Sequence, residues 1–121
     1  MIWLAVAAGG ALGSMARYAF STAVLRVTGS LFPVGTFAVN FVGCVVFGAI
    51  IGAAQQRVNL TPEVRAFVLV GLLGGFTTFS TYAFESIGLL RDGQFAAAAL
   101  NIVGQVMCGL VGMWVAYVIT N

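Results

Sequence analysis

The residues with the clearest chemical potential lie in one stretch, Gly71-Leu-Leu-Gly-Gly-Phe-Thr-Thr-Phe-Ser-Thr-Tyr82, in the middle of an apolar segment. Two adjacent glycines each weaken a helix by up to about 1 kcal/mol relative to alanine, and five hydroxyl residues follow them. We therefore expect the helix to break here. Freed carbonyls near Gly74 and Thr77 can coordinate a cation, while N–H groups and hydroxyls such as Ser80 and Thr81 can donate to an anion. The alternative is a continuous helix whose hydroxyls bond to its own carbonyls.

Two further apolar segments carry polar residues at helical spacing. Asn40 follows Thr36 by one turn, and Asn101 and Gln105 have the same spacing near the end of the chain. Amides offer N–H donors without net charge, which suits an anion that must be held and then released. Hydrogen bonds that only join one helix to another would use the same residues.

Two charged residues and two aromatic residues complete the candidate site. Arg17 and Glu85 lie inside apolar segments, where a charge is costly and often functional. Arg17 suits either anion attraction at a vestibule or an anchor at the membrane interface, and Glu85 suits the lining of a wet vestibule or a pair with an arginine. Phe79 and Tyr82 are three residues apart, so their electropositive ring edges share one helix face, although packing alone explains such spacing.

Composition indicates that these residues are positioned by helices in a lipid bilayer. The 121 residues are 61% hydrophobic and 7% charged, with a mean hydropathy of +1.08. Since a span needs roughly 20 apolar residues, the sequence predicts an all-α integral membrane protein with one four-span domain over residues 1–121. The expected helices are 2–25, 34–54, 64–90 and 95–119.

Charge and glycine patterns bear on assembly. Arg57 and Arg65 in the second loop balance Arg26 and Arg91 in the first and third, so insertion in both orientations is expected, and an antiparallel dimer is possible. Pairs with GxxxG spacing suit either a dimer or packing within the chain: they are Gly9 and Gly13, Gly48 and Gly52, and Gly71 and Gly75. The scattered arginines form no basic run, which argues against nucleic-acid binding.

With these residues in view, the sequence resembles the Fluc (CrcB) fluoride channels over its whole length. The resemblance is carried by Gly9-Gly-Ala-Leu-Gly13 with Arg17-Tyr18, by Pro33-Val-Gly-Thr36 with Val39-Asn40 and Gly43, and most specifically by Gly74-Gly-Phe-Thr-Thr-Phe-Ser-Thr-Tyr82. It implies an antiparallel, dual-topology homodimer in the bacterial inner membrane. Two parallel pores would let cytoplasmic fluoride leave passively and confer fluoride resistance, without enzyme chemistry.

The resemblance also implies roles for individual residues. The backbone carbonyls of Gly74 and Thr77 would hold a structural sodium ion at the dimer interface. Asn40 would be a pore-lining donor, and Phe79 and Tyr82 would line the anion path. Tyr82 stands where the family more commonly has phenylalanine, and its added O–H donor is expected to change how tightly fluoride binds or how fast it passes.

Two other functions remain open on the sequence alone. A small multidrug-resistance-type exporter also has four short helices, but it needs a membrane carboxylate on its first helix, and no Asp or Glu precedes Glu63. A structural membrane scaffold would use the glycines for packing and would leave the central hydroxyls unexplained.

Overall fold

The chain is almost entirely helical, which confirms the all-α prediction. The computed structural model describes residues 1–56 and 59–121, so Arg57, which entered the charge comparison, lies outside the described residues. The elements are α1 (Ile2–Thr28), α2 (Val34–Gln56), α3 (Pro62–Arg65), the π-helix η1 (Ala66–Leu73), α4 (Gly74–Phe76), α5 (Phe79–Arg91) and α6 (Phe95–Thr120). The third expected helix is thus a series of four elements, and the other three extend one to three residues beyond the expected ends.

Local sequence signals explain where the helices begin and end. α1 stops at Gly29, whose left-handed φ of 58° lets its N–H donate to the Leu25 carbonyl oxygen. α3 begins with Thr61 as its N-cap, since the Thr61 side chain accepts a hydrogen bond from Val64 N at 3.3 Å, and Pro62 takes the first helical position. Gly93, with a φ of 72°, forms the short turn between α5 and α6.

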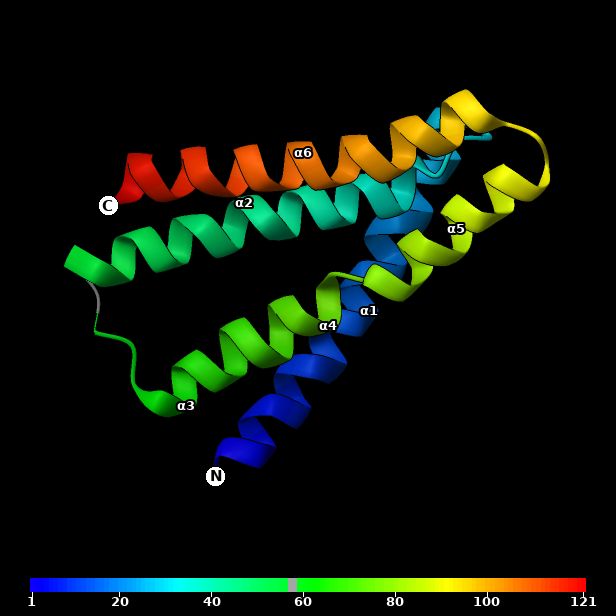
Figure 1. The fold of residues 1–121 in the computed structure, drawn as a ribbon. Coiled ribbons are helices and arrows are strands. Elements are labelled where there is room, and N and C mark those ends of the chain that lie inside the picture. Colours follow the sequence, from blue (N-terminus) through cyan, green and yellow to red (C-terminus); the bar gives the residue numbers. More distant parts are fainter. Residues whose placement is uncertain (57–58) are drawn as a thin grey trace.

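The helices form two parallel pairs. α2 and α6 lie side by side and run in the same direction, while α1 runs along η1 and α4 (Figure 1). Glycines set the close approach in both pairs: a Cβ at Gly48 would collide with the Met113 carbonyl, and one at Gly13 would collide with the Leu72 carbonyl. All three GxxxG pairs have such contacts, so the glycines pack within the chain.

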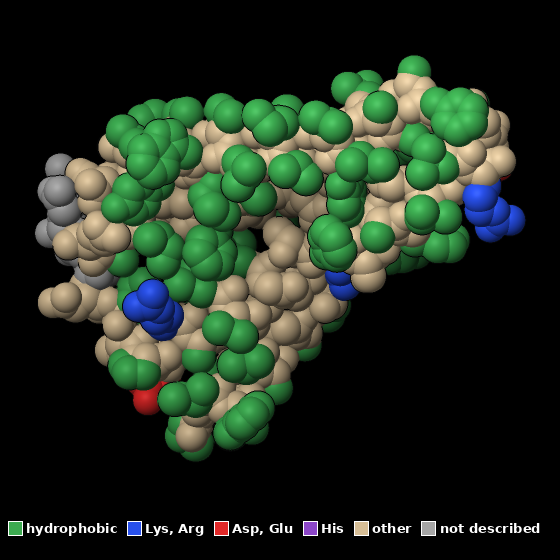
Figure 2. All heavy atoms as spheres, viewed as in Figure 1, with side chains coloured by type: hydrophobic (Ala, Val, Ile, Leu, Met, Phe, Trp, Pro, Cys, Tyr) green, Lys and Arg blue, Asp and Glu red, His purple; other side chains and the backbone are tan. Residues whose placement is uncertain are grey.

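Many large apolar side chains are exposed, and they are spread over the face of the molecule that Figure 2 shows. In α6 the buried positions are Ala98, Asn101, Gln105 and Gly109, one stripe of small and polar residues, whereas Leu110 is 62% and Val103 59% exposed. Polar residues inside and apolar residues outside are the pattern expected for a helix in lipid.

Among the described residues, three helical stretches are long and apolar enough to cross a membrane: Val34–Gln55, Pro62–Arg91 and Phe95–Thr120. α1 has the necessary length at 27 residues. Arg17, Ser14 and Ser21 lower the hydropathy of its centre, which accounts for its absence from this set.

The predicted break is present, but it begins later than the glycines. Gly74 keeps helical angles of −63° and −36°, and the chain becomes extended at Thr77 (φ −82°, ψ 158°) and Thr78 (φ −149°, ψ 118°). A short extended segment separates α4 from α5 (Figure 1). The helix therefore unwinds where side chains offer new hydrogen-bond partners to the backbone, one turn after the residues with the lowest helix propensity.

Candidate functional site at the helix break

Thr78 is the centre of the break, and Asn40 from α2 satisfies both of its backbone groups. The Thr78 N–H donates to Asn40 Oδ1 at 2.8 Å, and Asn40 Nδ2 donates to the Thr78 carbonyl oxygen at 3.0 Å. The Thr78 hydroxyl caps α5 by accepting from Thr81 N at 3.3 Å. A buried extended residue needs such partners because no water is available in a bilayer core.

These bonds free two particular carbonyls. In a continuous helix the N–H of Thr78 would donate to the carbonyl of Gly74, and the N–H of Thr81 to that of Thr77. Both N–H groups donate instead to side chains, so Gly74 and Thr77 lose their helical donors. They are the same two carbonyls for which the sequence suggested a cation.

The surroundings of the two carbonyls differ. Arg17 Nη1 donates to the Thr77 oxygen over a long 3.4 Å. A Cβ at Gly75 would approach the Gly10 carbonyl to 2.7 Å, whereas one at Gly74 would meet only the Leu69 oxygen at 3.7 Å. Packing within the chain therefore explains the glycine at 75 but not the one at 74, which lies on the exposed surface.

A polar cavity of about 390 Å³ lies on the α1 side of the break. Arg17, Thr36 and Thr81 line it together with Thr78, so the structure brings together three residues that the sequence had singled out on three helices. Ser14, Tyr18, Ser21 and Val39 complete the lining. Sequence reasoning missed the two serines, although Ser14, Arg17 and Ser21 repeat at helical spacing and could have been read as one polar face.

Glu85 lies beside this cavity through its contact with Thr36. The Thr36 hydroxyl donates to Glu85 Oε1 at 2.8 Å, while Glu85 Oε2 is buried and has no hydrogen-bond partner among the described residues. The arginine partner that the sequence suggested is thus replaced by a hydroxyl. A buried carboxylate oxygen without a partner is costly in a membrane helix and marks Glu85 as a candidate functional residue.

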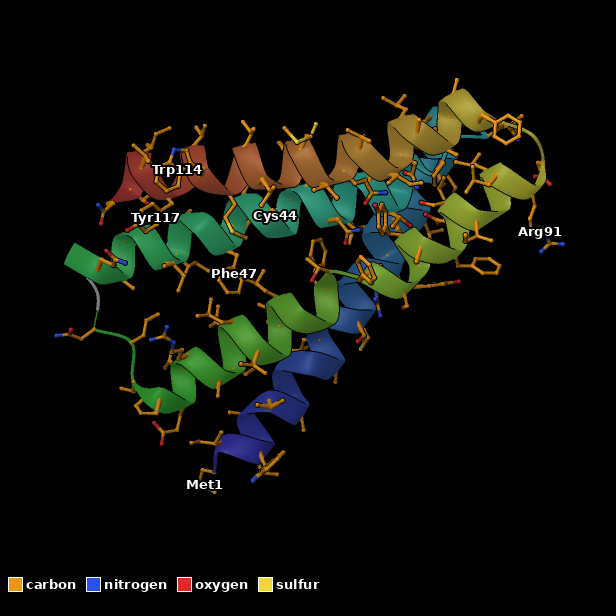
Figure 3. The ribbon with its side chains drawn as sticks, in the orientation of Figure 1. Met1, Cys44, Phe47, Arg91, Trp114 and Tyr117 are labelled. Carbon is orange, nitrogen blue, oxygen red and sulfur yellow. The ribbon has the colours of Figure 1, made fainter. Side chains whose placement is uncertain are left out.

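A second hollow lies on the other side of the break, between α2 and the η1–α4 arm (Figure 2). This groove has a volume of about 280 Å³, and its wall includes Asn40, Thr77, Thr78 and Phe79. Phe47 points into the same space from α2 (Figure 3). Since Thr78 lines both the groove and the polar cavity, the break is the partition between them.

The two aromatic candidates have different environments. Their ring centroids are 5.4 Å apart at an interplanar angle of 46°, yet Phe79 is 78% exposed and Tyr82 only 9%. The Tyr82 hydroxyl donates to the Ile102 carbonyl oxygen of α6 at 3.0 Å. Ser80 is exposed beside Phe79, with its hydroxyl 3.5 Å from that of Thr78.

Amides from α6 extend the site. Asn40 Nδ2 also donates to Gln105 Oε1 at 2.8 Å, and Gln105 Nε2 donates to Asn101 Oδ1 at 2.8 Å. Asn101 in turn donates to Ser86 of α5 at 2.9 Å. Sequence reasoning missed Ser86, because a single serine in a helix gives no signal until its neighbour on another helix is known.

No group of three or more His, Cys, Asp or Glu residues that could hold a metal ion occurs in the part of the chain that the structure describes. Backbone carbonyls such as those of Gly74 and Thr77 are the ligands that the break offers to a cation. This arrangement is known from broken membrane helices.

Together, the lipid-facing exterior, the broken helix and the polar groups gathered at the break define a helical membrane protein of the channel and transporter class. The family model for CrcB-like protein, Camphor Resistance (CrcB), matches residues 4–117. The chain belongs to this family.

Curated relatives agree. A fluoride-specific ion channel FluC of Maridesulfovibrio salexigens is 50% identical over 107 residues, covering 88% of this chain and 85% of the relative. One from Nitratidesulfovibrio vulgaris (strain Miyazaki F) is 48% identical over 105 residues, with coverage of 87% and 85%. One from Nitrosococcus oceani is 43% identical over 121 residues, with coverage of 100% and 95%.

Proposed function

We propose that this protein is a fluoride-specific ion channel that lets fluoride leave the bacterial cytoplasm passively across the inner membrane and so confers resistance to fluoride. Its relatives carry that name. The observation that carries the proposal is the break at Thr78, where hydroxyls and amides converge between two hollows inside a bundle with an apolar exterior. No chemistry on the ion is needed, so the protein acts as a channel and not as an enzyme.

The residues around the break suit successive parts of an anion path. Arg17 at the polar cavity attracts an anion from water, and the hydroxyls of Ser80 and Thr81 supply donors once the anion loses its hydration shell. Thr36 lines the cavity, but its hydroxyl donates to Glu85. Phe79 and Tyr82 present ring edges of positive potential. A compact anion that accepts strong hydrogen bonds gains most from such a lining.

We propose four spans, with α1 as the first. Alternate spans of a membrane bundle run in the same direction, and α1 runs parallel to η1 and α4 as α2 does to α6. The polar side of α1, with Ser14, Arg17 and Ser21, lines the cavity beside α2.

The functional unit is proposed to be an antiparallel homodimer with dual topology. Phe79 is 78% exposed although it belongs to the break, and the groove beside it is open in one chain. A second copy would cover both and would approach the exposed Gly74, where no side chain stands in the way. The balanced arginines of the loops allow the two orientations that such a dimer needs.

A structural sodium ion is proposed to join the two copies through the Gly74 and Thr77 carbonyls. The fit is supported by the loss of both helical donors and by the absence of a Cβ at residue 74. When bound, the ion would supply a fixed positive charge at the dimer interface. Arg17, which donates to the Thr77 oxygen, would have to share that oxygen or turn away.

The two alternative functions receive less support. An exporter of the multidrug type needs an acid on its first helix, and α1 contains none. The acid Glu85 lies on α5 instead, where it accepts a hydrogen bond from Thr36. A scaffold explains the glycine contacts but gives no reason for a polar cavity beside a break whose backbone is bonded to an amide of another helix.

Flux from liposomes tests the proposal. Purified protein reconstituted in vesicles loaded with potassium fluoride is expected to release the fluoride, followed with a fluoride electrode, after a potassium ionophore is added. Vesicles loaded with potassium chloride should retain their chloride. Fluoride retention at the level of protein-free vesicles would refute the function, and equal release of both anions would refute the selectivity.

A further inference from the structure

We infer that Asn101 and Gln105 of α6 are positioning residues for the channel: they fix the Asn40 amide in the one orientation that keeps the helix open at Thr78. The inference rests on the proposed function for its consequence in flux. Its structural basis is a chain of hydrogen bonds that runs from the break to α6 and on to α5.

The orientation of Asn40 is dictated by the backbone of Thr78. The Thr78 N–H can only donate, so the Asn40 atom that faces it at 2.8 Å must be the acceptor Oδ1. Nδ2 then faces the Thr78 carbonyl at 3.0 Å and Gln105 at 2.8 Å. A flipped amide would place a donor against the Thr78 N–H and its oxygen against the Thr78 carbonyl.

The orientation of Asn40 determines the orientation of the next two amides. Because Asn40 presents Nδ2, Gln105 must present Oε1, which leaves its Nε2 to donate to Asn101 Oδ1 at 2.8 Å. Asn101 Nδ2 then donates to the Ser86 hydroxyl at 2.9 Å, and that hydroxyl donates to the Tyr82 carbonyl at 2.7 Å. From Thr78 to Ser86, each group donates to the next one in the series. The single N–H of Thr78 therefore determines the orientation of three amides.

Burial makes this arrangement hard to exchange for another. Asn101 is 0% exposed, Ser86 4% and Gln105 8%, and the surrounding helices face lipid. An amide that turned would leave donors and acceptors unpaired where no water can replace the lost partner. Both N–H groups of Asn40 are also occupied in this arrangement, by Thr78 and Gln105.

The consequence concerns the backbone at the break. If Asn40 turned away, the helical acceptor for the Thr78 N–H would be the Gly74 carbonyl. That bond would close the break and occupy a carbonyl assigned to the sodium ion. The α6 amides thus act on the site through Asn40, without a contact of their own to the break.

A set of α6 variants tests this role by fluoride flux. Gln105→Met and Asn101→Leu each remove one link while nearly keeping side-chain volume, and each is expected to lower fluoride efflux about tenfold. The double variant should be no slower than the slower single variant, because either change already breaks the chain. Val106→Met, on the neighbouring exposed face, should behave as wild type.

Two flux outcomes would overturn the role. Losses that multiply to about a hundredfold in the double variant would mean that the two amides act independently. Single variants with wild-type flux would mean that they only join helices. Size-exclusion profiles matching that of the wild type ensure that flux is compared between folded proteins.

A readout without fluoride separates this inference from the proposed function. In protein with ¹⁵N-labelled threonine, the amide resonance of Thr78 should shift in Gln105→Met and stay in place in Val106→Met. An unshifted Thr78 resonance would overturn the positioning role even if fluoride passes. A shifted resonance in a protein that carries no fluoride at all would retain the role of α6 at the break and refute the channel function.

Discussion

The two ends of the α2–α6 pair use different means to hold the same two helices together. Near their C-terminal ends, Gly48 and Gly52 let the backbone of α2 approach Met113 and Tyr117 of α6 directly, and the Thr120 hydroxyl is 3.0 Å from the Ala49 carbonyl oxygen. Toward their N-terminal ends, Asn40, Gln105 and Asn101 connect the helices through amides. In lipid, where apolar side chains gain little from meeting one another, small residues provide tight packing and amides provide direction. The C-terminal contacts hold the two helices together, and the N-terminal amides position the break.

Glycine packing also joins α1 to η1 and α4, and its disruption is expected to have the largest effect on stability. Gly13→Ala would place a Cβ against the Leu72 carbonyl and near the Phe76 nitrogen. Overpacking of this kind costs about 1–3 kcal/mol, so loss of folded protein is expected by size-exclusion chromatography and thermal melting. In Gly10→Ala the added Cβ meets nothing within 4 Å, so this neighbour should fold normally. Equal behaviour of the two variants would contradict the packing assigned to α1.

Removal of sodium should lower the stability by up to about the same amount. A ligand at a hundred times its dissociation constant stabilises a folded protein by about 2.7 kcal/mol. The melting temperature of the purified dimer should therefore rise with sodium chloride and remain low in the same concentration of N-methylglucamine chloride. A melting temperature that depends only on ionic strength would argue against a sodium ion at Gly74 and Thr77.

Tyr82→Phe should have the smallest effect. The Tyr82 hydroxyl donates to the Ile102 carbonyl, so it is not free to donate to fluoride. The variant should lose about 1 kcal/mol of stability, typical of one hydrogen bond, while fluoride flux changes by less than about threefold. A change of tenfold or more in flux would restore the idea that the phenol binds the anion.

Residue types and spacing were sufficient to predict the helical class, the break and the grouping of Arg17, Thr36 and Asn40 with it. They failed where the outcome depends on residues far apart in sequence. The break falls at Thr78 because Asn40, 38 positions away, offers both an acceptor and a donor. The Tyr82 hydroxyl is bound because an α6 carbonyl lies within reach.

The π-helix η1 was also not predicted. Its residues form an ordinary apolar run, and a run of that kind does not distinguish one helix type from another. Close contact with the glycines of α1 accompanies it in the structure.

Fluoride efflux through Asn40→Leu tests the central claim most directly, because this change removes the hydrogen-bond partners of both backbone groups of Thr78 with little change in volume. Phe41→Leu is the matched control. It introduces a leucine at the next position, and the Phe41 side chain lies against Gly112 of α6, away from the break. We expect Asn40→Leu to form a dimer and to pass fluoride at least about a hundredfold more slowly, the upper range for losing a buried polar partner, while Phe41→Leu retains wild-type flux. Wild-type efflux through Asn40→Leu would contradict the account of conduction at the Thr78 break.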